Sequence, residues 1–362
     1  MKDLTIVTSQ GNGAIDTYGR RLAYTLGALP IELDSTRSFG IHWYDPRALK
    51  LETKQFLDSR MLQELGPIHF THHHMARHIP TLSQPCVLTV HDLFRQEDRI
   101  ESRYPSYKPL ISKTTSLDNM HLYRDFRGIE EADHIIAVSQ YTKNQLRVWP
   151  GISDDKITVV YQGVDHLPEP KRREAAKFIL FVGTEQPRKN FEGVLQAFIH
   201  IHRWYPEIYL LKVGISGGKK LREKSLRRVE ELGLQDRVIF TGHVSDKNLA
   251  DMYSSAICLV MPSYREGFGY PALEAMRYGC PVIVSAHPCL PETVGSAGLI
   301  VGKIGKTFTQ ELAQAIDSVI TSKAVRQDLA RKGRARAKRF TWARTAKETL
   351  AVYKKLGLNL SR

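Results

Sequence analysis

Two glutamates, Glu266 and Glu274, lie in the stretch REGFGYPALEAMRYGCPVIVS (residues 265–285), separated by a segment that holds two glycines, aromatic residues and a proline. The apolar run ICLVMPS (residues 257–263) precedes them, and PVIVS (residues 281–285) follows. Both runs have the length of a buried strand. We therefore expect a strand, a loop, a helix and a second strand, with Glu266 in the loop and Glu274 in the first turn of the helix.

The residue types in this loop suit a ligand that is both anionic and rich in hydroxyls. In open parallel sheets, ligands bind beyond the carboxyl ends of the strands. Gly267 and Gly269 let main-chain N–H groups approach an anion closely, Pro271 suits a first helical turn, and a helix N-terminus favours an anion such as a diphosphate. Ionised carboxylates only accept hydrogen bonds, and vicinal hydroxyls of sugars are natural donors to them. The pattern predicts a nucleotide-sugar site. The alternative is that Glu266 only ends a turn and that Glu274 only stabilises the N-terminus of the helix.

A second stretch, FVGTEQPRKNFEGVL (residues 181–195), places two cations at another junction of strand and helix. A strand ends at Gly183, and Arg188 and Lys189 precede the helix. Two cations at such a loop hold a diphosphate leaving group and neutralise the charge that develops on it. Exposed cations in a turn are the alternative. The two glutamates are expected at the same edge of the sheet, and this coincidence favours a phosphate-binding role for Arg188 and Lys189.

The elements that must position these residues are those of an α/β fold. Apolar, strand-sized runs alternate with helical patterns in both halves of the chain, which indicates parallel sheets covered on both faces. A chain of 362 residues is long for one core. We expect two Rossmann-like domains, residues 1–165 and 166–340, joined by a polar, Pro-rich linker within residues 162–177. The last helical pattern, residues 341–356, is expected to pack back on the first domain.

The net charge of +14 is the unusual feature of the composition. Two basic clusters, residues 217–228 and 323–339, contribute to it, and solvated helix faces are the simplest explanation for both. A basic surface attracts nucleic acid, anionic lipid or phosphorylated substrates. Without interleaved aromatic residues or a known binding module, we expect no nucleic acid partner. No apolar run approaches the length of a membrane span, and the four cysteines form no C-x-x-C pair, so we expect a soluble, cytoplasmic protein with buried thiols.

An ordered series of segments along nearly the whole chain resembles the retaining glycosyltransferases of family 4. The series comprises TVHDLF (residues 89–94), ADHIIAVSQYTKNQL (132–146), VVYQGVD (159–165), PRKN (187–190), EGFGYPALEAM (266–276) and PETVGSAGLIV (291–301). The resemblance implies the GT-B fold, in which two Rossmann-like domains with parallel sheets face each other across an interdomain cleft.

The resemblance also implies roles. Glu274 would bind the donor ribose, Glu266 the transferred hexose with a share in catalysis, and Arg188 with Lys189 the diphosphate. His91, followed by Asp92, would face the reacting sugar from the first domain. Further donor contacts are implied at the ends of the second domain's strands and in the glutamate loop: Gly183, Thr184, His243, Val244, Gly267, Phe268, Gly269 and Tyr270. The implied chemistry retains the α-configuration by front-face displacement, with no metal and no cofactor.

Two positions depart from the family pattern. Thr184 stands where many members carry an arginine, which makes the assignment of the phosphate contacts to Arg188 less direct. Gln162 stands where asparagine is usual, at the entry to the linker.

The stretch GNGAIDTYGRR (residues 11–21) resembles a dinucleotide fingerprint, so a nicotinamide-dependent oxidoreductase is an alternative. Asp16 occupies the place of the third glycine, where an acid would repel a pyrophosphate. The resemblance instead assigns this loop, with Gly11, Asn12 and Gly13, to the border of the donor phosphates and the acceptor.

The stretch THHHMARH (residues 71–78) places His72, His73, His74 and His78 in an expected loop after a strand. His74 and His78 would share one face of a helix, which is a spacing used for zinc. No cysteine or glutamate that could complete a zinc site lies nearby in the sequence. We therefore prefer two other interpretations over a zinc site: a polar loop that faces the acceptor, or a loop whose histidines bind no ligand.

The sequence thus predicts an enzyme that moves a hexose from a nucleotide-diphosphate sugar to a hydroxyl acceptor, either a glycan or a lipid-linked saccharide. Mannose from GDP-mannose is the leading expectation because of the PRKN segment. Peripheral contact with an anionic membrane fits the basic charge. The alternatives are a nucleotide-sugar epimerase of the same fold, the oxidoreductase, and a basic binding protein without activity.

Overall fold

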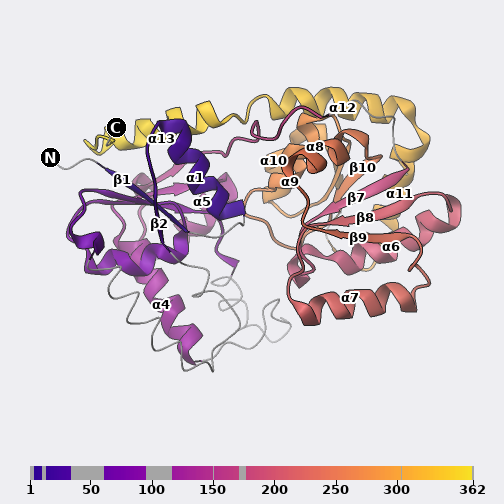
Figure 1. Ribbon diagram of the computed structural model, residues 1–362, viewed down its shortest axis with the longest axis horizontal. Helices are drawn as coiled ribbons and strands as arrows, with labels where there is room; N and C mark the ends of the chain where they lie inside the picture. Colours follow the sequence, from indigo (N-terminus) through magenta and orange to yellow (C-terminus); the bar gives the residue numbers. More distant parts are fainter. Residues whose placement is uncertain are drawn as a thin grey trace. The chain divides into compact units, whose positions relative to one another are not determined.

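The computed structural model describes residues 4–9, 14–33, 61–94, 116–149, 151–170, 177–302 and 304–360. The chain divides into two compact units, which are coloured along the sequence in Figure 1. Unit 1 comprises Met1–Gly163 and Trp342–Arg362, and unit 2 comprises Val164–Thr341. The chain therefore passes between the units twice.

Unit 1 is built on a parallel sheet with the strand order β2-β1-β3-β4-β5-β6. The strands are β1 (Thr5–Ser9), β2 (Ile31–Leu33), β3 (Ile68–Phe70), β4 (Cys86–Val90), β5 (His134–Ala137) and β6 (Ile157–Val159). The helices are α1 (Ala14–Leu26), η1 (His73–Thr81), α4 (Ser116–Glu131), α5 (Gln140–Arg147), η2 (Asp154–Lys156) and α13 (Trp342–Lys355), of which η1 and η2 are 3₁₀ helices. The strand order changes direction between β1 and β3, so the loops after these two strands flank the expected ligand position.

The C-terminal helix α13 completes the core of unit 1. Val352 and Tyr353 are buried against Leu4, Ile6 and other residues of the sheet. The hydroxyl of Tyr353 lies 2.5 Å from Nδ1 of His69, whose Nε2 lies 2.8 Å from Oγ1 of Thr89. A buried polar ring is retained only where its nitrogens are hydrogen-bonded, so this network fixes α13 to strands β3 and β4.

Gly128 allows helix α4 to lie directly on η1. A Cβ atom at this position would stand 1.7 Å from the main-chain oxygen of Ala76. We expect Gly128→Ala to lower the free energy of unfolding of unit 1 by about 3 kcal/mol, because main chain must move to admit the methyl group. Urea denaturation measures this effect. Gly27→Ala is the control, because its φ of +71° is unfavourable for alanine but nothing lies within 4 Å of the new methyl group; a loss of about 1 kcal/mol is expected there. Equal losses in the two variants would contradict the prediction.

Unit 2 is built on a second parallel sheet, with the order β12-β11-β10-β7-β8-β9. The strands are β7 (Phe178–Val182), β8 (Tyr209–Val213), β9 (Val238–Gly242), β10 (Cys258–Met261), β11 (Val282–Ser285) and β12 (Leu299–Val301). The helices are η3 (Pro187–Lys189), α6 (Phe191–Trp204), α7 (Lys219–Glu231), α8 (Asp246–Ser255), α9 (Tyr270–Arg277), α10 (Cys289–Val294), η4 (Gly295–Ala297), α11 (Phe308–Thr321) and α12 (Lys323–Ala337).

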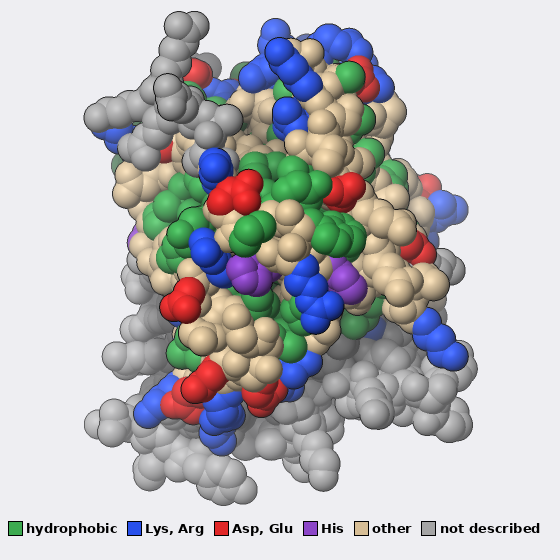
Figure 2. Space-filling model, turned by 90° about the vertical axis from the view of Figure 1, so that its right-hand side faces the viewer, with side chains coloured by type: hydrophobic (Ala, Val, Ile, Leu, Met, Phe, Trp, Pro, Cys, Tyr) green, Lys and Arg blue, Asp and Glu red, His purple; other side chains and the backbone are tan. Residues whose placement is uncertain are grey.

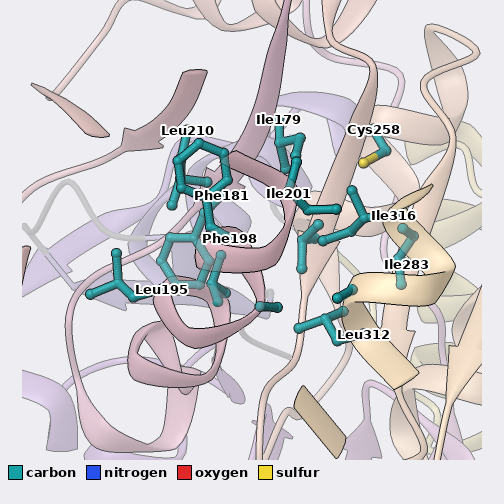
Figure 3. Packing of buried hydrophobic residues seen from close by; sticks show 14 of the residues in the cluster. Ile179, Phe181, Leu195, Phe198, Ile201, Leu210, Cys258, Ile283, Leu312 and Ile316 are labelled. Atoms are coloured by element: carbon teal, nitrogen blue, oxygen red, sulfur yellow. The ribbon is translucent and has the colours of Figure 1, made fainter. Parts of the chain in front are cut away.

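The largest part of the core of unit 2 lies between this sheet and helices α6 and α11. Figure 3 shows side chains of both helices pointing toward those of the strands, among them Phe198, Ile201, Leu312, Ile316, Ile179 and Leu210. The strand order changes direction between β7 and β10, which pair in parallel. The loops after these two strands carry the Arg188–Lys189 pair and Glu266. The two cations and the first glutamate therefore lie at the position where doubly wound sheets bind their ligands.

The expected α/β fold with two Rossmann-like parallel sheets is confirmed. Strands β2 and β12 were not predicted, because each has three residues at a sheet edge and lacks a long apolar run. The prediction of a loop for the histidine-rich segment is wrong, since residues 73–81 form the 3₁₀ helix η1. All four cysteines are free and buried, as expected. Among the described residues, no helix combines the length and apolar character needed to cross a bilayer.

Candidate active site

Glu266 and the two predicted phosphate-binding cations come together at the ends of β7 and β10. Nζ of Lys189 lies 2.5 Å from Oε1 of Glu266, and Nη1 of Arg188 lies 3.7 Å from Oε2. The hydroxyl of Ser263 donates to the same Oε1 at 2.7 Å. The main chain joins the two loops as well, because the N–H of Tyr264 donates to the carbonyl of Arg188 at 2.7 Å.

The charge of Glu266 is set by this surrounding. Burial raises the pKa of its carboxyl. The Lys189 ammonium, the Arg188 guanidinium and the hydrogen bonds from Lys189 and Ser263 lower this pKa by more than burial raises it, so the net pKa lies below the usual value. Glu266 is therefore ionised at neutral pH. Its negative charge offsets part of the positive charge of Lys189 and Arg188.

Glu274 lies in the second turn of helix α9 in unit 2, and the prediction that it lies in the first turn is wrong, because the helix already begins at Tyr270. Its Oε1 lies 3.2 Å from Nε2 of His166, and the hydroxyl of Tyr253 donates to its Oε2 at 3.0 Å. The Glu274 side chain is 7% exposed. Neither His166 nor Tyr253 was predicted as a site residue, because each is remote from Glu274 in sequence and carries no motif of its own.

The loop between the two glutamates contains one residue with a left-handed backbone conformation, Gly269. Gly269 has φ of +88°, in the left-handed region that favours glycine, and it precedes the first residue of α9. Phe268 is buried, and its carbonyl accepts a hydrogen bond from the hydroxyl of Thr293. Helix α9 thus begins directly after a left-handed turn at Gly269.

The end of β7 carries an unsatisfied hydroxyl. Oγ1 of Thr184 is buried and has no hydrogen-bond partner. A buried hydroxyl without a partner costs free energy, so it marks a position where a ligand group would be stabilised. Gly183, just before it, has φ of +153° and donates its N–H to the carbonyl of Val213.

The loop after β7 is stabilised by a buried ion network around Glu185, which the sequence did not predict. Glu185 and Lys212, which are 1% and 0% exposed in their side chains, pair at 2.9 Å. Arg222 and the N–H of Gly217 also donate to Glu185, at 2.7 Å and 2.8 Å. Burial raises the pKa of the Glu185 carboxyl, but Lys212 and the main-chain donors outweigh it, so the net pKa is lowered. The network ties the loop after β8 to the segment that leads to Arg188.

The remaining predicted donor contacts lie beyond strand β9. His243 is exposed and Val244 is half-buried, and both precede Ser245, whose hydroxyl caps α8 by accepting from the N–H of Asn248. They occupy the carboxyl edge of the same sheet.

His91 lies at the end of β4 in unit 1, with both ring nitrogens in hydrogen bonds. Nε2 lies 2.9 Å from the carbonyl of Thr71, and Nδ1 lies 3.1 Å from Nε2 of Gln162. Gln162, one of the two residues that depart from the family pattern, thus orients His91. Asp92 is half-buried and accepts from the N–H of Phe94. The predicted loop residues Gly11, Asn12 and Gly13 lie outside the described residues, while Asp16 in the first turn of α1 accepts from the hydroxyl of Ser9.

The histidines after β3 form the one group of potential metal ligands found among the described residues: the ligand atoms of His72, His73 and His74 lie within 4.8 Å of one another. Nδ1 of His72 accepts from the N–H of His74. A neutral ring in this state carries its hydrogen on Nε2, which makes that atom a donor and not a metal ligand. His74 instead faces the buried Asp125, which also binds Arg77.

The buried histidines make unit 1 sensitive to acid. Burial lowers the pKa of His69 to about 3 and that of His91 to about 4, whereas a histidine in an unfolded chain titrates near 6.5. Between these values the unfolded state binds more protons, so the free energy of unfolding falls as the pH drops below about 6.5. We expect up to about 1.4 kcal/mol per pH unit for each histidine. Urea denaturation at pH 7, 6 and 5 tests this expectation. His69→Gln, which does not titrate, is expected to reduce the slope, and a stability that is constant over this range would contradict it.

The basic segment within residues 323–339 is partly structural. Arg336 donates to the carbonyls of Thr293 and Glu292 at the end of α10, at 2.9 Å and 2.6 Å. Arg326 donates to the carbonyls of Val319 and Ile320 at the end of α11. On the face drawn in Figure 2, Lys and Arg side chains stand in several separate groups, divided by hydrophobic and uncharged atoms. The basic charge therefore does not form one continuous patch on this face.

A doubly wound parallel sheet whose switch point carries two cations, an ionised glutamate and a glycine turn is an arrangement typical of proteins that bind a phosphate-bearing ligand. Comparison with known proteins specifies the class. The family model described as "Glycosyltransferase Family 4" matches residues 3–166, and the model described as "Glycosyl transferases group 1" matches residues 165–336. The chain belongs to the family 4 glycosyltransferases, which have the GT-B fold.

The similar proteins include some that are named as mannosyltransferases. The O-antigen chain mannosyltransferase B of Escherichia coli is 28% identical over 308 residues, which cover 80% of this chain and 74% of that protein. The serotype-specific mannosyltransferase WbdA of Escherichia coli is 28% identical over 261 residues, which cover 66% of this chain but 31% of that protein.

Solved structures share the fold. A sucrose-phosphate synthase of Thermosynechococcus elongatus superposes with a TM-score of 0.77 at 23% identity, over 99% of both chains. HepE of Anabaena, in complex with UDP and glucose, superposes with a TM-score of 0.76 at 17% identity, over 98% of this chain and 100% of that one.

Proposed function

We propose that this glycosyltransferase moves a hexose from a nucleotide-diphosphate sugar to a hydroxyl of a glycan or lipid-linked saccharide and retains the α-configuration. The observation that supports it most is the group of Lys189, Arg188 and Glu266 at the switch point of unit 2, where Glu266 holds the cations 2.5 Å and 3.7 Å from its oxygens. Cations placed there neutralise the charge that develops on a departing diphosphate.

The roles of the individual residues follow from their positions. Lys189 and Arg188 would bind the diphosphate and release Glu266, whose ionised carboxylate would then accept hydrogen bonds from the hexose hydroxyls. Thr184, with its unpartnered hydroxyl, would bind a phosphate oxygen. Glu274 would bind the ribose. Because cationic side chains supply the charge at the diphosphate, we propose a reaction that uses no metal and no cofactor.

We propose GDP-mannose as the donor. The PRKN segment supports this choice, and so do the relatives named as mannosyltransferases. A UDP-sugar donor is the principal alternative, because HepE, which shares the fold, binds UDP and glucose.

Calorimetric titration with GDP, UDP, ADP, dTDP and NAD⁺ tests the proposal. We expect one nucleoside diphosphate, GDP first, to bind to the protein, and Glu274→Gln to weaken this binding about tenfold. Binding of NAD⁺ alone would overturn the proposal in favour of the oxidoreductase. Incubation with GDP-mannose, with and without a saccharide acceptor, then separates a transferase from an epimerase, since an epimerase changes the donor when no acceptor is present.

We further propose that the enzyme makes peripheral contact with an anionic membrane that carries a lipid-linked acceptor. Helix α7 supports this proposal, because its Lys219, Lys220, Lys224 and Arg227 are exposed. Co-sedimentation with phosphatidylglycerol vesicles at low salt is expected, and it should be lost when these four residues are changed to glutamate. The absence of binding by the unaltered protein would refute this part of the proposal.

A further inference from the structure

Tyr253 lies on helix α8 and donates its hydroxyl to the carboxylate of Glu274 on helix α9. The distance from this hydroxyl to Oε2 is 3.0 Å. Helix α9 begins directly after the Gly269 turn, and helices α8 and α9 pack against each other. One oxygen of the carboxylate is therefore held by a residue from a different helix, 21 positions earlier in the chain.

The side chain of Tyr253 lies inside unit 2, out of reach of solvent. Tyr253 is 0% exposed, whereas the Glu274 side chain is 7% exposed. The Tyr253 ring stacks on that of Tyr278, with centroids 6.2 Å apart and an interplanar angle of 12°. The hydroxyl of Tyr278 in turn donates to the carbonyl of Pro168 at 2.8 Å. A ligand in solution can therefore reach Glu274 but not Tyr253, so an effect of the Tyr253 hydroxyl on binding must pass through Glu274.

The Tyr253 hydroxyl keeps its proton at neutral pH. Burial first, and the neighbouring Glu274 carboxyl second, raise the pKa of this hydroxyl well above its usual value. The hydroxyl is therefore available as a donor, and its one hydrogen is directed at Oε2. A carboxylate accepts about four hydrogen bonds, so acceptor positions on Glu274 remain for a ligand.

We propose that Tyr253 is a positioning residue for ribose recognition, which holds the carboxylate of Glu274 in the rotamer that accepts hydrogen bonds from the ribose hydroxyls. A glutamate side chain has several rotatable bonds, and fixing them at the moment of binding costs free energy. A buried donor that fixes Oε2 beforehand removes part of this cost. The inference rests on the proposed function, which places the nucleotide ribose at Glu274.

The test compares GDP with 2′,3′-dideoxy-GDP by calorimetry on the full-length protein. Tyr253→Phe keeps the buried ring and removes only the hydroxyl. We expect it to weaken GDP binding about fivefold and to leave the binding of the dideoxy analogue unchanged, because that analogue has no ribose hydroxyl for Glu274 to bind. A loss of unit 2 structure would weaken both nucleotides alike. If the protein prefers UDP, then UDP and its dideoxy analogue replace the guanosine nucleotides.

Two further variants separate positioning from other effects. In a Glu274→Ala protein, Tyr253→Phe should have no additional effect on GDP binding, because the carboxylate through which the hydroxyl acts is absent. Tyr205 provides a matched control: its hydroxyl also donates to a carboxylate of unit 2, that of Asp317 at 2.6 Å, but it precedes β8 at the amino edge of the sheet. Tyr205→Phe should bind both nucleotides as the unaltered protein does.

The inference is overturned if Tyr253→Phe binds GDP as tightly as the unaltered protein, or if it weakens GDP and the dideoxy analogue equally. If the unaltered protein still prefers GDP to the analogue in that case, and Glu274→Gln reduces this preference, the proposed ribose site survives and the role of Tyr253 alone fails. If the unaltered protein binds GDP and the analogue equally, or binds neither GDP nor UDP, the ribose site and the role of Tyr253 are both refuted.

Discussion

Replacement of Glu266 by glutamine is expected to lower kcat for hexose transfer by at least about 100-fold, while the affinity for the nucleoside diphosphate stays unchanged or rises. The carboxylate accepts from Lys189 and Ser263 and lies near Arg188. Loss of its charge releases the cations for the diphosphate, which favours binding of the product nucleotide. The same loss removes the acceptor that is expected to hold the reacting hexose, an effect of roughly 2.7 kcal/mol on the transition state.

The two kinetic constants distinguish Glu266 from its neighbour in the motif. Glu274→Gln should mainly raise the KM for the donor, because a ribose contact is equally strong in the ground state and the transition state. Steady-state kinetics with GDP-mannose, together with GDP titrations, measure both effects. A Glu266→Gln enzyme whose kcat lies within tenfold of the unaltered value would show that this carboxylate has no part in the chemical step.

Replacement of Lys212 by methionine is expected to destabilise unit 2 by about 3 to 5 kcal/mol. Lys212 is fully buried, pairs with Glu185 and also donates to the carbonyls of Gly214 and Ile215. Removal of one partner of a buried ion pair leaves the other charge insufficiently compensated. Urea denaturation, followed by a signal from unit 2, measures the loss.

Two further variants show whether the unpaired charge is the cause. Lys212→Met combined with Glu185→Leu should recover most of the stability, since neither buried charge remains. Lys219→Met, at an exposed position of α7, should change the stability by no more than about 0.5 kcal/mol. If the double variant is as unstable as Lys212→Met, the loss comes from the carbonyl contacts and not from Glu185.

The central strands could be predicted from the sequence because each is a run of apolar residues buried on both faces. The segments FILFV and CLVM became β7 and β10, and their ends positioned Arg188, Lys189 and Glu266 as expected. The 3₁₀ helix η1 could not be predicted in the same way. Its turns are stabilised by a side-chain cap from His72 and by packing against α4, and neither produces a hydrophobic period.

The residues that contact Glu274 and that stabilise the loop after β7 were not predicted, for a different reason. Tyr253 belongs to no motif, and its contact with Glu274 depends on how α8 packs on α9. Lys212 did carry a signal, because a single lysine within the apolar run YLLKV requires a buried anion. The identity of that anion, Glu185, follows only from the pairing of β7 with β8.

The hydrogen bond between Tyr353 and His69 has a consequence for the order of events during synthesis of the chain. Unit 2 is a continuous segment and has all its residues once Thr341 has emerged from the ribosome. Unit 1 begins first but still lacks α13 at that time, so His69 has no Tyr353 to bind and the apolar surface around Leu4 and Ile6 is uncovered. Of the two units, the one whose synthesis begins first is therefore the last to become complete, and a nascent chain arrested before Trp342 would present an exposed apolar surface to chaperones.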